Sequence, residues 1–123
     1  MSTGDATRSQ VRPLVMPLPD AAPYVPLLTP SAESIALRCG LVALAPGTEC
    51  GEHTTGAHEE LIICLSGAGE IYAEGLGTAP LAAGQIAYNP PNTRHNVRNT
   101  GSAPLRYVFV VAPQAPQLTQ AGS

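Results

Sequence analysis

The chain contains no lysine and no tryptophan, and its only phenylalanine is Phe109. Without lysine, its side chains cannot form a Schiff base or supply the lysine of a P-loop, which excludes both chemistries. All six basic residues are arginines, set against nine acidic residues, and no basic run exists. The electrostatic footprint of nucleic-acid binding is therefore missing, and we expect no nucleic-acid partner.

Long apolar runs are missing as well. Pro13, Pro17 and Pro19 interrupt the apolar residues near the N-terminus, so neither a signal peptide nor a membrane-spanning helix is predicted. We expect a soluble, cytoplasmic protein that has no membrane partner. The cysteines are odd in number and lack C-x-x-C spacing, so we expect free thiols rather than a disulfide framework; they are Cys39, Cys50 and Cys64.

A length of 123 residues leaves room for one domain. We expect a β-barrel over residues 33–113, a proline-rich and partly disordered N-terminal arm over residues 1–32, and a flexible tail over residues 114–123. Six prolines between residues 11 and 30 exclude a helix and a central strand there. The arm is apolar and the chain has only 4% aromatic residues, so we expect a homodimer that supports a marginal core.

The central part of the sequence predicts short strands between turn residues, and no helix. Ser66-Gly67-Ala68-Gly69 is typical of a hairpin turn, and alternate residues from Ile35 to Ala43 fall on one face of the first strand. Such a pattern indicates an all-β sandwich or barrel with jelly-roll topology. The strands are expected over residues 35–44, 51–54, 61–65, 70–73, 85–88, 95–99 and 105–112.

The three histidines and two neighbouring acids are the candidates for chemistry. His53 and His58 lie close together, Glu59 and Glu60 follow at once, and His95 comes later. First-row divalent metals prefer neutral imidazole and carboxylate ligands. On spacing alone, a polar surface loop explains the first cluster equally well.

Two motifs carry a family resemblance. Residues 47–67 resemble the first cupin motif, G-x5-H-x-H-x(3,4)-E-x6-G, and residues 84–99 resemble the second, G-x5-P-x-G-x2-H-x3-N. Two fixed positions differ, because Thr55 replaces the second histidine and Asn92 replaces a glycine. The chain thus resembles a small single-domain, metal-binding member of the cupin superfamily. The matching residues are Gly47, His53, Glu60, Gly67, Gly84, Pro90, His95 and Asn99.

The resemblance implies a cupin jelly-roll β-barrel with one divalent metal ion per subunit, which could be Fe, Mn, Ni or Zn. Carried over residue by residue, it implies that His53, Glu60 and His95 bind the metal. Thr55 stands where a fourth ligand is usual, and it is a poor ligand. His58 shares the face of Glu60 if the strand already runs there, so it is either the substitute ligand or a residue of the turn that faces solvent.

The same resemblance implies a function. We expect a metal-dependent enzyme, dioxygenase-like, that acts on a small polar organic molecule. A sugar isomerase or epimerase, a cyclase, and a non-catalytic small-ligand-binding cupin remain the alternatives.

Several other residues are expected to have structural roles. Ile62 and Cys64 have the parity of Glu60 and should line the interior, whereas Glu59 should point outward. Asn99 is also expected to have a structural role. Core packing is expected for Tyr72, Tyr88 and Tyr107, and solvated outer positions are expected for Arg38 and Arg106.

Overall fold

The computed structural model describes residues 11–20 and 23–114, and the expected tails at 1–10 and 115–123 lie outside this range. The described residues form nine strands and no helix, which confirms the all-β prediction. No segment of this part of the chain is a helix that could cross a membrane. The strands are β1 (Tyr24–Leu28), β2 (Arg38–Leu44), β3 (His53–Thr54), β4 (His58–Ser66), β5 (Ala68–Ala73), β6 (Gly77–Ala82), β7 (Ile86–Asn89), β8 (Arg94–Arg98) and β9 (Leu105–Pro113).

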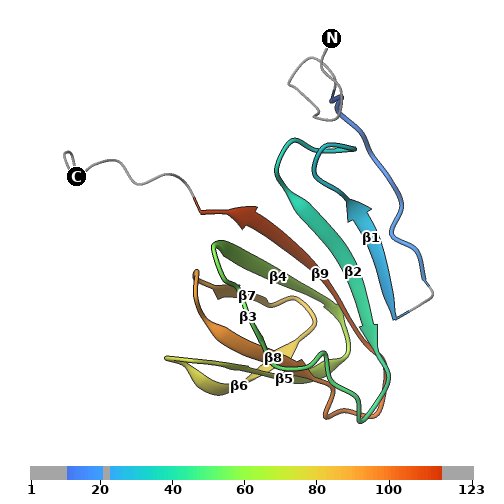
Figure 1. The fold of residues 1–123 in the computed structure, drawn as a ribbon. Coiled ribbons are helices and arrows are strands. Elements are labelled where there is room, and N and C mark those ends of the chain that lie inside the picture. The colour runs from blue at the N-terminus through green and yellow to red at the C-terminus, as the bar shows by residue number, and fades with distance from the viewer. Residues whose placement is uncertain (1–10, 21–22, 115–123) are drawn as a thin grey trace, which may run out of the picture.

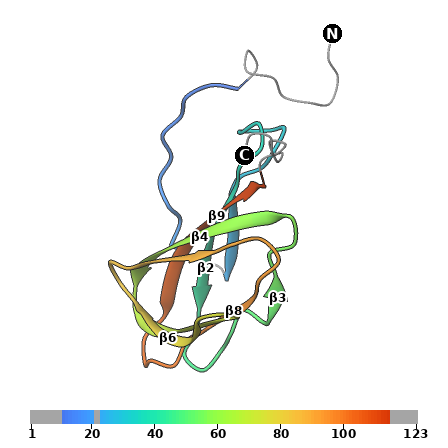
Figure 2. The same ribbon diagram turned by 90° about the vertical axis from the view of Figure 1, so that its left-hand side faces the viewer.

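The strands form two sheets that face each other, as Figures 1 and 2 show. One sheet has the order β1-β2-β9-β4-β7 and the other has the order β3-β8-β5-β6. Each strand of the larger sheet is antiparallel to its neighbours, and the same holds in the smaller sheet. The predicted jelly-roll architecture is therefore correct.

The main core lies between the two sheets. Side chains alternate along each strand, so every second residue of β4 faces inward, and Ile62 and Cys64 are buried there as predicted. A second apolar cluster lies on the opposite face of the larger sheet, around Leu41 and Val108. The main core consists of Val42, Leu44, Ile62, Cys64, Ile71, Leu81, Val97, Leu105 and Tyr107.

Two edge strands contain proline, and neither was among the strands expected from the sequence. Pro26 lies in β1 and Pro80 lies in β6, and each of these strands is at the edge of its sheet. Proline has no N–H, so in a central strand it would leave a carbonyl of a neighbouring strand without its donor. An edge strand has one unpaired side, toward which the proline nitrogen can point. β1 thus comes from the segment expected as an arm. The strand expected over 35–44 begins only at Arg38.

The hairpin predicted at residues 66–69 is wrong. β4 and β5 follow each other directly but belong to different sheets, so the chain turns a corner between them. Gly67 has φ of 87° at this corner. A Cβ there would overlap the carbonyl oxygen of Pro104 and lie 2.9 Å from the Cα of Leu105. Only a glycine allows the two segments to pass this closely.

Asn99 is structural, as expected. Its side-chain amide donates hydrogen bonds of 2.8 Å to the carbonyl oxygens of Leu44 and Ala103. Its side-chain oxygen accepts a hydrogen bond of 2.9 Å from the backbone N–H of Gly101. One buried side chain thus supplies hydrogen-bond partners to backbone groups of the loop between β8 and β9, and joins this loop to the end of β2.

The expectations for tyrosine and arginine are only partly correct. Tyr107 is buried, but Tyr72 and Tyr88 are 36% and 57% exposed, which contradicts core packing. Tyr88 lies on edge strand β7, and its hydroxyl donates a 2.8 Å hydrogen bond to the outward-facing Glu59. Arg38 is exposed as expected. Arg106 is half-buried because its guanidinium donates a 3.0 Å hydrogen bond to the carbonyl of Pro19.

Two glycines with the same backbone conformation allow the cost of close packing at Gly67 to be separated from the cost of backbone strain. Gly67 and Gly84 have the same φ of 87°, but a Cβ on Gly84 would meet nothing within 4 Å. We expect Gly84→Ala to cost about 1–2 kcal/mol of unfolding free energy, from the left-handed backbone alone. Gly67→Ala should cost about 1–3 kcal/mol more, because it adds overpacking. Urea unfolding of both variants measures the difference, and equal losses would contradict the close approach.

Candidate metal-binding site

Strand pairing places two of the predicted ligands beside each other. His53 on β3 is the direct register partner of His95 on β8. Their ring centroids lie 4.2 Å apart, with the ring planes at 63°. Residues 42 positions apart in the sequence thus become neighbours through one antiparallel pair.

Glu60 reaches the same point from the opposite sheet. It is the inward-facing residue near the start of β4, and its Oε1 lies 3.0 Å from Nε2 of His95. The two side chains are 11% and 2% exposed respectively. Asn89, the last residue of β7, donates a 3.1 Å hydrogen bond to the same carboxylate oxygen. The structure therefore brings His53, Glu60 and His95 to the border of one cavity, and their role as metal ligands stays a prediction.

Both imidazoles are oriented by backbone carbonyls. Nδ1 of His53 lies 2.8 Å from the carbonyl oxygen of Gly51, and Nδ1 of His95 lies 3.0 Å from that of Thr93. A neutral histidine whose Nδ1–H donates in this way carries its lone pair on Nε2. This outer hydrogen bond is the usual means of fixing a metal-ligating histidine. In both residues the acceptor is the carbonyl two positions earlier.

Gly51, whose carbonyl orients His53, is itself held in place by its neighbours. Its φ is 106°, which favours glycine, and its N–H donates a 2.8 Å hydrogen bond to the side-chain oxygen of Asn96. Asn96 in turn donates to Glu49 at 2.7 Å. These contacts fix the backbone whose carbonyl orients His53.

Thr55, at the position of the missing motif histidine, has a structural role. Its hydroxyl donates a 2.7 Å hydrogen bond to the carbonyl of Pro90 and accepts one of 3.0 Å from the N–H of Thr93. The hydroxyl therefore ties the β3–β4 loop to the turn before β8. The hydroxyl is thus used as both donor and acceptor within the protein.

His58 is the first residue of β4 and is exposed. It shares the inward parity of Glu60, as predicted, and it borders a small hollow of about 150 Å³ together with Thr55 and the three predicted ligands. Its role as a fourth ligand stays a prediction.

The electrostatics of His95 reflect its burial. Burial acts to lower its pKa, while the nearby carboxylate of Glu60 and the carbonyl of Thr93 raise it, and the net result is a pKa above the ordinary value. The 3.0 Å contact between Nε2 and Glu60 is not aligned as a hydrogen bond, so this buried nitrogen lacks a well-directed partner. The side-chain oxygen of Asn89 is also buried without a partner.

The residues present fit a divalent metal ion. Metal–ligand bonds of about 2.0–2.2 Å place neighbouring donor atoms about 3 Å apart, and His95 Nε2 and Glu60 Oε1 already have that separation. Over residues 11–20 and 23–114, however, no group of three or more His, Cys, Asp or Glu side chains is placed as it would be around an ion. The pair of His95 and Glu60 is thus the part of the site whose donor atoms already have the separation of metal ligands.

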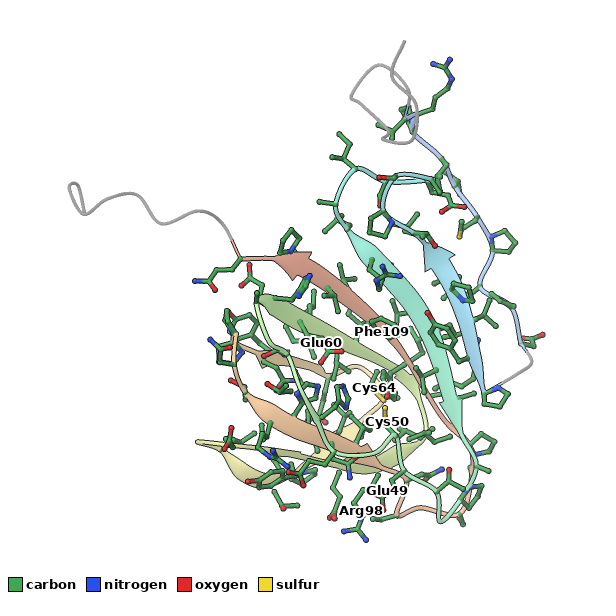
Figure 3. The ribbon with its side chains drawn as sticks, viewed as in Figure 1. Glu49, Cys50, Glu60, Cys64, Arg98 and Phe109 are labelled. Carbon is green, nitrogen blue, oxygen red and sulfur yellow. The ribbon has the colours of Figure 1, made fainter. Side chains whose placement is uncertain are left out.

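A cavity of about 450 Å³ opens from these residues into the space between the sheets. Figure 3 shows Glu60, Phe109 and Cys50 within this region. No sequence pattern pointed to Tyr24, Cys50 or Phe109 as site residues, although Phe109 is the only phenylalanine of the chain. The cavity is bordered by Pro23, Tyr24, Val42, Leu44, Glu49, Cys50, His53, Glu60, Ile62, His95, Val97, Tyr107, Phe109 and Val111.

Tyr107 supplies a neutral hydroxyl at the cavity wall. Burial raises its pKa far above the ordinary value, and the neighbouring Cys50 and Glu60 add to this effect. Its hydroxyl therefore keeps its proton over the whole range in which the protein would work. Cys64 on β4 is the register partner of Tyr107 on β9. It is buried in the core as a small apolar residue, as predicted.

Two curated relatives come from Streptomyces. Protein SchB of Streptomyces halstedii is 35% identical over 92 residues, which are 74% of this chain and 66% of that protein. A protein of Streptomyces cyaneus named polyketide synthase CurC is 36% identical over 78 residues, which are 63% of this chain. The chain spans 66% and 50% of the lengths of these two relatives.

Solved structures share the fold. A predicted oxalate decarboxylase from Thermotoga maritima is 25% identical with a TM-score of 0.69, and the match covers 73% of this chain and 78% of that one. A cupin 2 conserved barrel domain protein from Salinispora arenicola is 25% identical with a TM-score of 0.65, covering 88% and 90%. The BH2720 protein of Bacillus halodurans is 23% identical with a TM-score of 0.72, covering 95% and 92%.

The family model of the cupin domain matches residues 40–111, which contain the paired histidines, Glu60 and most of the cavity wall. This match covers more than half of the chain and agrees with the two motifs and the two facing sheets. The chain belongs to the cupin family.

Proposed function

We propose that the protein is a metal-dependent enzyme in which His53, Glu60 and His95 hold one divalent ion. The observation that carries this proposal is the buried Nε2 of His95, which faces the Glu60 carboxylate at 3.0 Å without a directed hydrogen bond. Leaving a buried nitrogen without a partner costs free energy, and such exceptions are typical of functional sites. An ion between the nitrogen and the carboxylate would satisfy both.

Three protein ligands would leave coordination positions open, and the ion would supply Lewis-acid activation of a substrate oxygen there. The chain's own residues have distinct roles around it. Asn89 holds the Glu60 carboxylate in place, and the neutral hydroxyl of Tyr107 can donate a hydrogen bond to a substrate oxygen. The aliphatic cavity wall keeps water away, which strengthens each of these polar contacts.

The cavity favours a substrate that differs from the small polar molecule expected from the sequence. Most of its lining is aliphatic or aromatic, and three of its polar side chains are the predicted ligands. Burying many hydroxyl groups against such a wall would leave them without partners, at a cost of about 1–3 kcal/mol each. We therefore propose an apolar substrate body with oxygen substituents at one end.

A set of two histidines and one carboxylate is the one used by non-haem iron oxygenases, which supports a dioxygenase-like reaction. The relative named polyketide synthase CurC supports a second candidate, an oxygen-independent cyclisation of a carbonyl compound. A non-catalytic binding role would keep the cavity and bind the same compounds without turnover.

The metal proposal is tested by elemental analysis after separate loading with Fe, Mn, Ni and Zn. We expect about one equivalent per subunit in the wild type, and a loss of at least tenfold in affinity for His95→Ala and Glu60→Gln, because each removes a donor. Glu59→Gln is the matched control from the same strand, because the Glu59 carboxylate faces outward to the hydroxyl of Tyr88, and it should retain the ion. A wild-type content below about half an equivalent with every metal would refute the proposal.

The reaction class is tested with the iron-loaded protein and a panel of 1,3-diketones and 1,2-dihydroxyarenes. We expect uptake of O₂ that matches loss of substrate, measured with an oxygen electrode and by chromatography. The zinc-loaded protein is the control, since zinc has no redox chemistry. Turnover without O₂ uptake would favour cyclisation instead, and binding without turnover would favour the non-catalytic role.

We also propose that the protein is a homodimer. The segment before β1 and the segment between β1 and β2 expose apolar side chains beside one sheet edge, and Val15 is fully exposed. A second copy could cover this surface. The exposed side chains are Leu14, Val15, Met16, Leu18, Ile35 and Leu37.

For the dimer, light scattering should give a mass near twice 12.6 kDa for the wild type. Val15→Asp should shift the mass toward the monomer, because a charge would have to be buried at the contact. Leu76→Asp is the control, since Leu76 is exposed in the β5–β6 hairpin, away from this surface. A wild-type monomer, or equal effects of the two variants, would contradict the proposal.

A further inference from the structure

Two aromatic rings form part of the cavity wall. Tyr24 on β1 and Phe109 on β9 lie with ring centroids 6.1 Å apart and planes within 15° of parallel. Both border the cavity. Phe109 is the only phenylalanine of the chain, and Tyr24 is one of four tyrosines. Half of Tyr24 is exposed even though a neighbouring ring is available to it.

Gly40 makes room for this pair. It lies in β2, in register with Phe109 on β9 and with Pro26 on β1. A Cβ at this position would lie 2.7 Å from two ring atoms of Phe109 and 2.8 Å from a ring atom of Tyr24. Gly40 has an ordinary backbone conformation, so the glycine serves close approach and not a turn. Both rings therefore rest on the strand between them.

The pair lies beyond the predicted ligands along the same wall. Glu60 pairs with Val111 on β9, and Phe109 is the next residue on β9 with the same inward direction. Tyr24 belongs to β1, which is separated from β4 by β2 and β9. Neighbouring strands lie about 4.7–4.9 Å apart, so the wall from Glu60 to Tyr24 spans roughly three strand spacings. A single small ring at the ligands would not reach Tyr24.

The lining between the two ends is aliphatic, with Val42, Ile62 and Val111 among its residues. A flat apolar body would contact this wall and stack on the rings, while its oxygen atoms would face His95 and Glu60. Stacking on an aromatic face adds to the gain from burying apolar area. A short dicarboxylate would gain from neither.

We propose that Tyr24 and Phe109, seated over Gly40, are specificity-determining residues that select a planar substrate of at least two fused rings with oxygen substituents at one edge. This inference rests on the proposed function for the identity of the oxygen-binding end. The ring preference itself comes from the chain's own side chains, so it does not require the metal.

The test compares two probes with the same oxygen pair, catechol and 2,3-dihydroxynaphthalene. Their affinities are measured by titration calorimetry with metal-free and with zinc-loaded protein. We expect the two-ring probe to bind at least tenfold more tightly than catechol in both forms. Zinc should strengthen the binding of both probes by a similar factor.

Variants then locate the preference. We expect Phe109→Leu and Tyr24→Leu to weaken binding of 2,3-dihydroxynaphthalene about fivefold or more, while the affinity for catechol stays within twofold. Gly40→Ala keeps both rings but displaces them, and should have the same effect. Tyr88→Leu is the matched control, because Tyr88 is an exposed edge-strand tyrosine outside the cavity. It should leave both affinities unchanged.

Equal affinities for the two probes in both protein forms would overturn the inference. So would a retained preference in Tyr24→Leu, a variant that should fold because Tyr24 is half-exposed on an edge strand. If zinc fails to strengthen either probe while the tenfold preference persists, the metal proposal fails and the aromatic recognition stands. The two proposals thus fail in different measurements.

Discussion

The packing of two antiparallel sheets face to face determines where each side chain of the cavity lies. Along β4, the inward-facing residues are Glu60, Ile62 and Cys64, so a single strand passes from the polar site through the cavity wall into the core. On β9, the register partners of these three residues are Val111, Phe109 and Tyr107, which face inward as well. Period-two alternation alone thus sorts these residues into the interior, and the pairing register decides which of them become neighbours.

The polar end of the cavity is held by backbone groups more than by other side chains. Carbonyl oxygens from Gly51 and Thr93 orient the two imidazoles, and each belongs to a segment that is itself hydrogen-bonded. Backbone contacts of this kind give little freedom to the rings they hold. The hydrogen bonds of Thr55 serve the same end, because they fix the turn that carries Thr93.

The apolar part of the cavity occupies space that a more compact protein would fill with side chains. Well-packed interiors contain few voids larger than a water molecule, so a cavity of about 450 Å³ is a cost to stability. Gly40, in the middle of a strand, adds to that cost. The chain offsets part of it elsewhere, with a second apolar cluster on the outer face of the larger sheet and with buried tethers such as Asn99.

The sequence by itself determined the all-β class and the two motifs, because alternation and motif spacing are local properties of the chain. The resemblance that these motifs carry then implied the candidates His53, Glu60 and His95. The sequence also indicated that Asn99 and Cys64 are structural. It did not reveal β1 and β6, since Pro26 and Pro80 are tolerated only at a sheet edge and edges exist only after strands pair. For the same reason the corner at Gly67 resembled a hairpin. Only the tertiary structure decided that Asn89 supports Glu60 and that Tyr24 meets Phe109 over Gly40, because these contacts join strands far apart in the sequence.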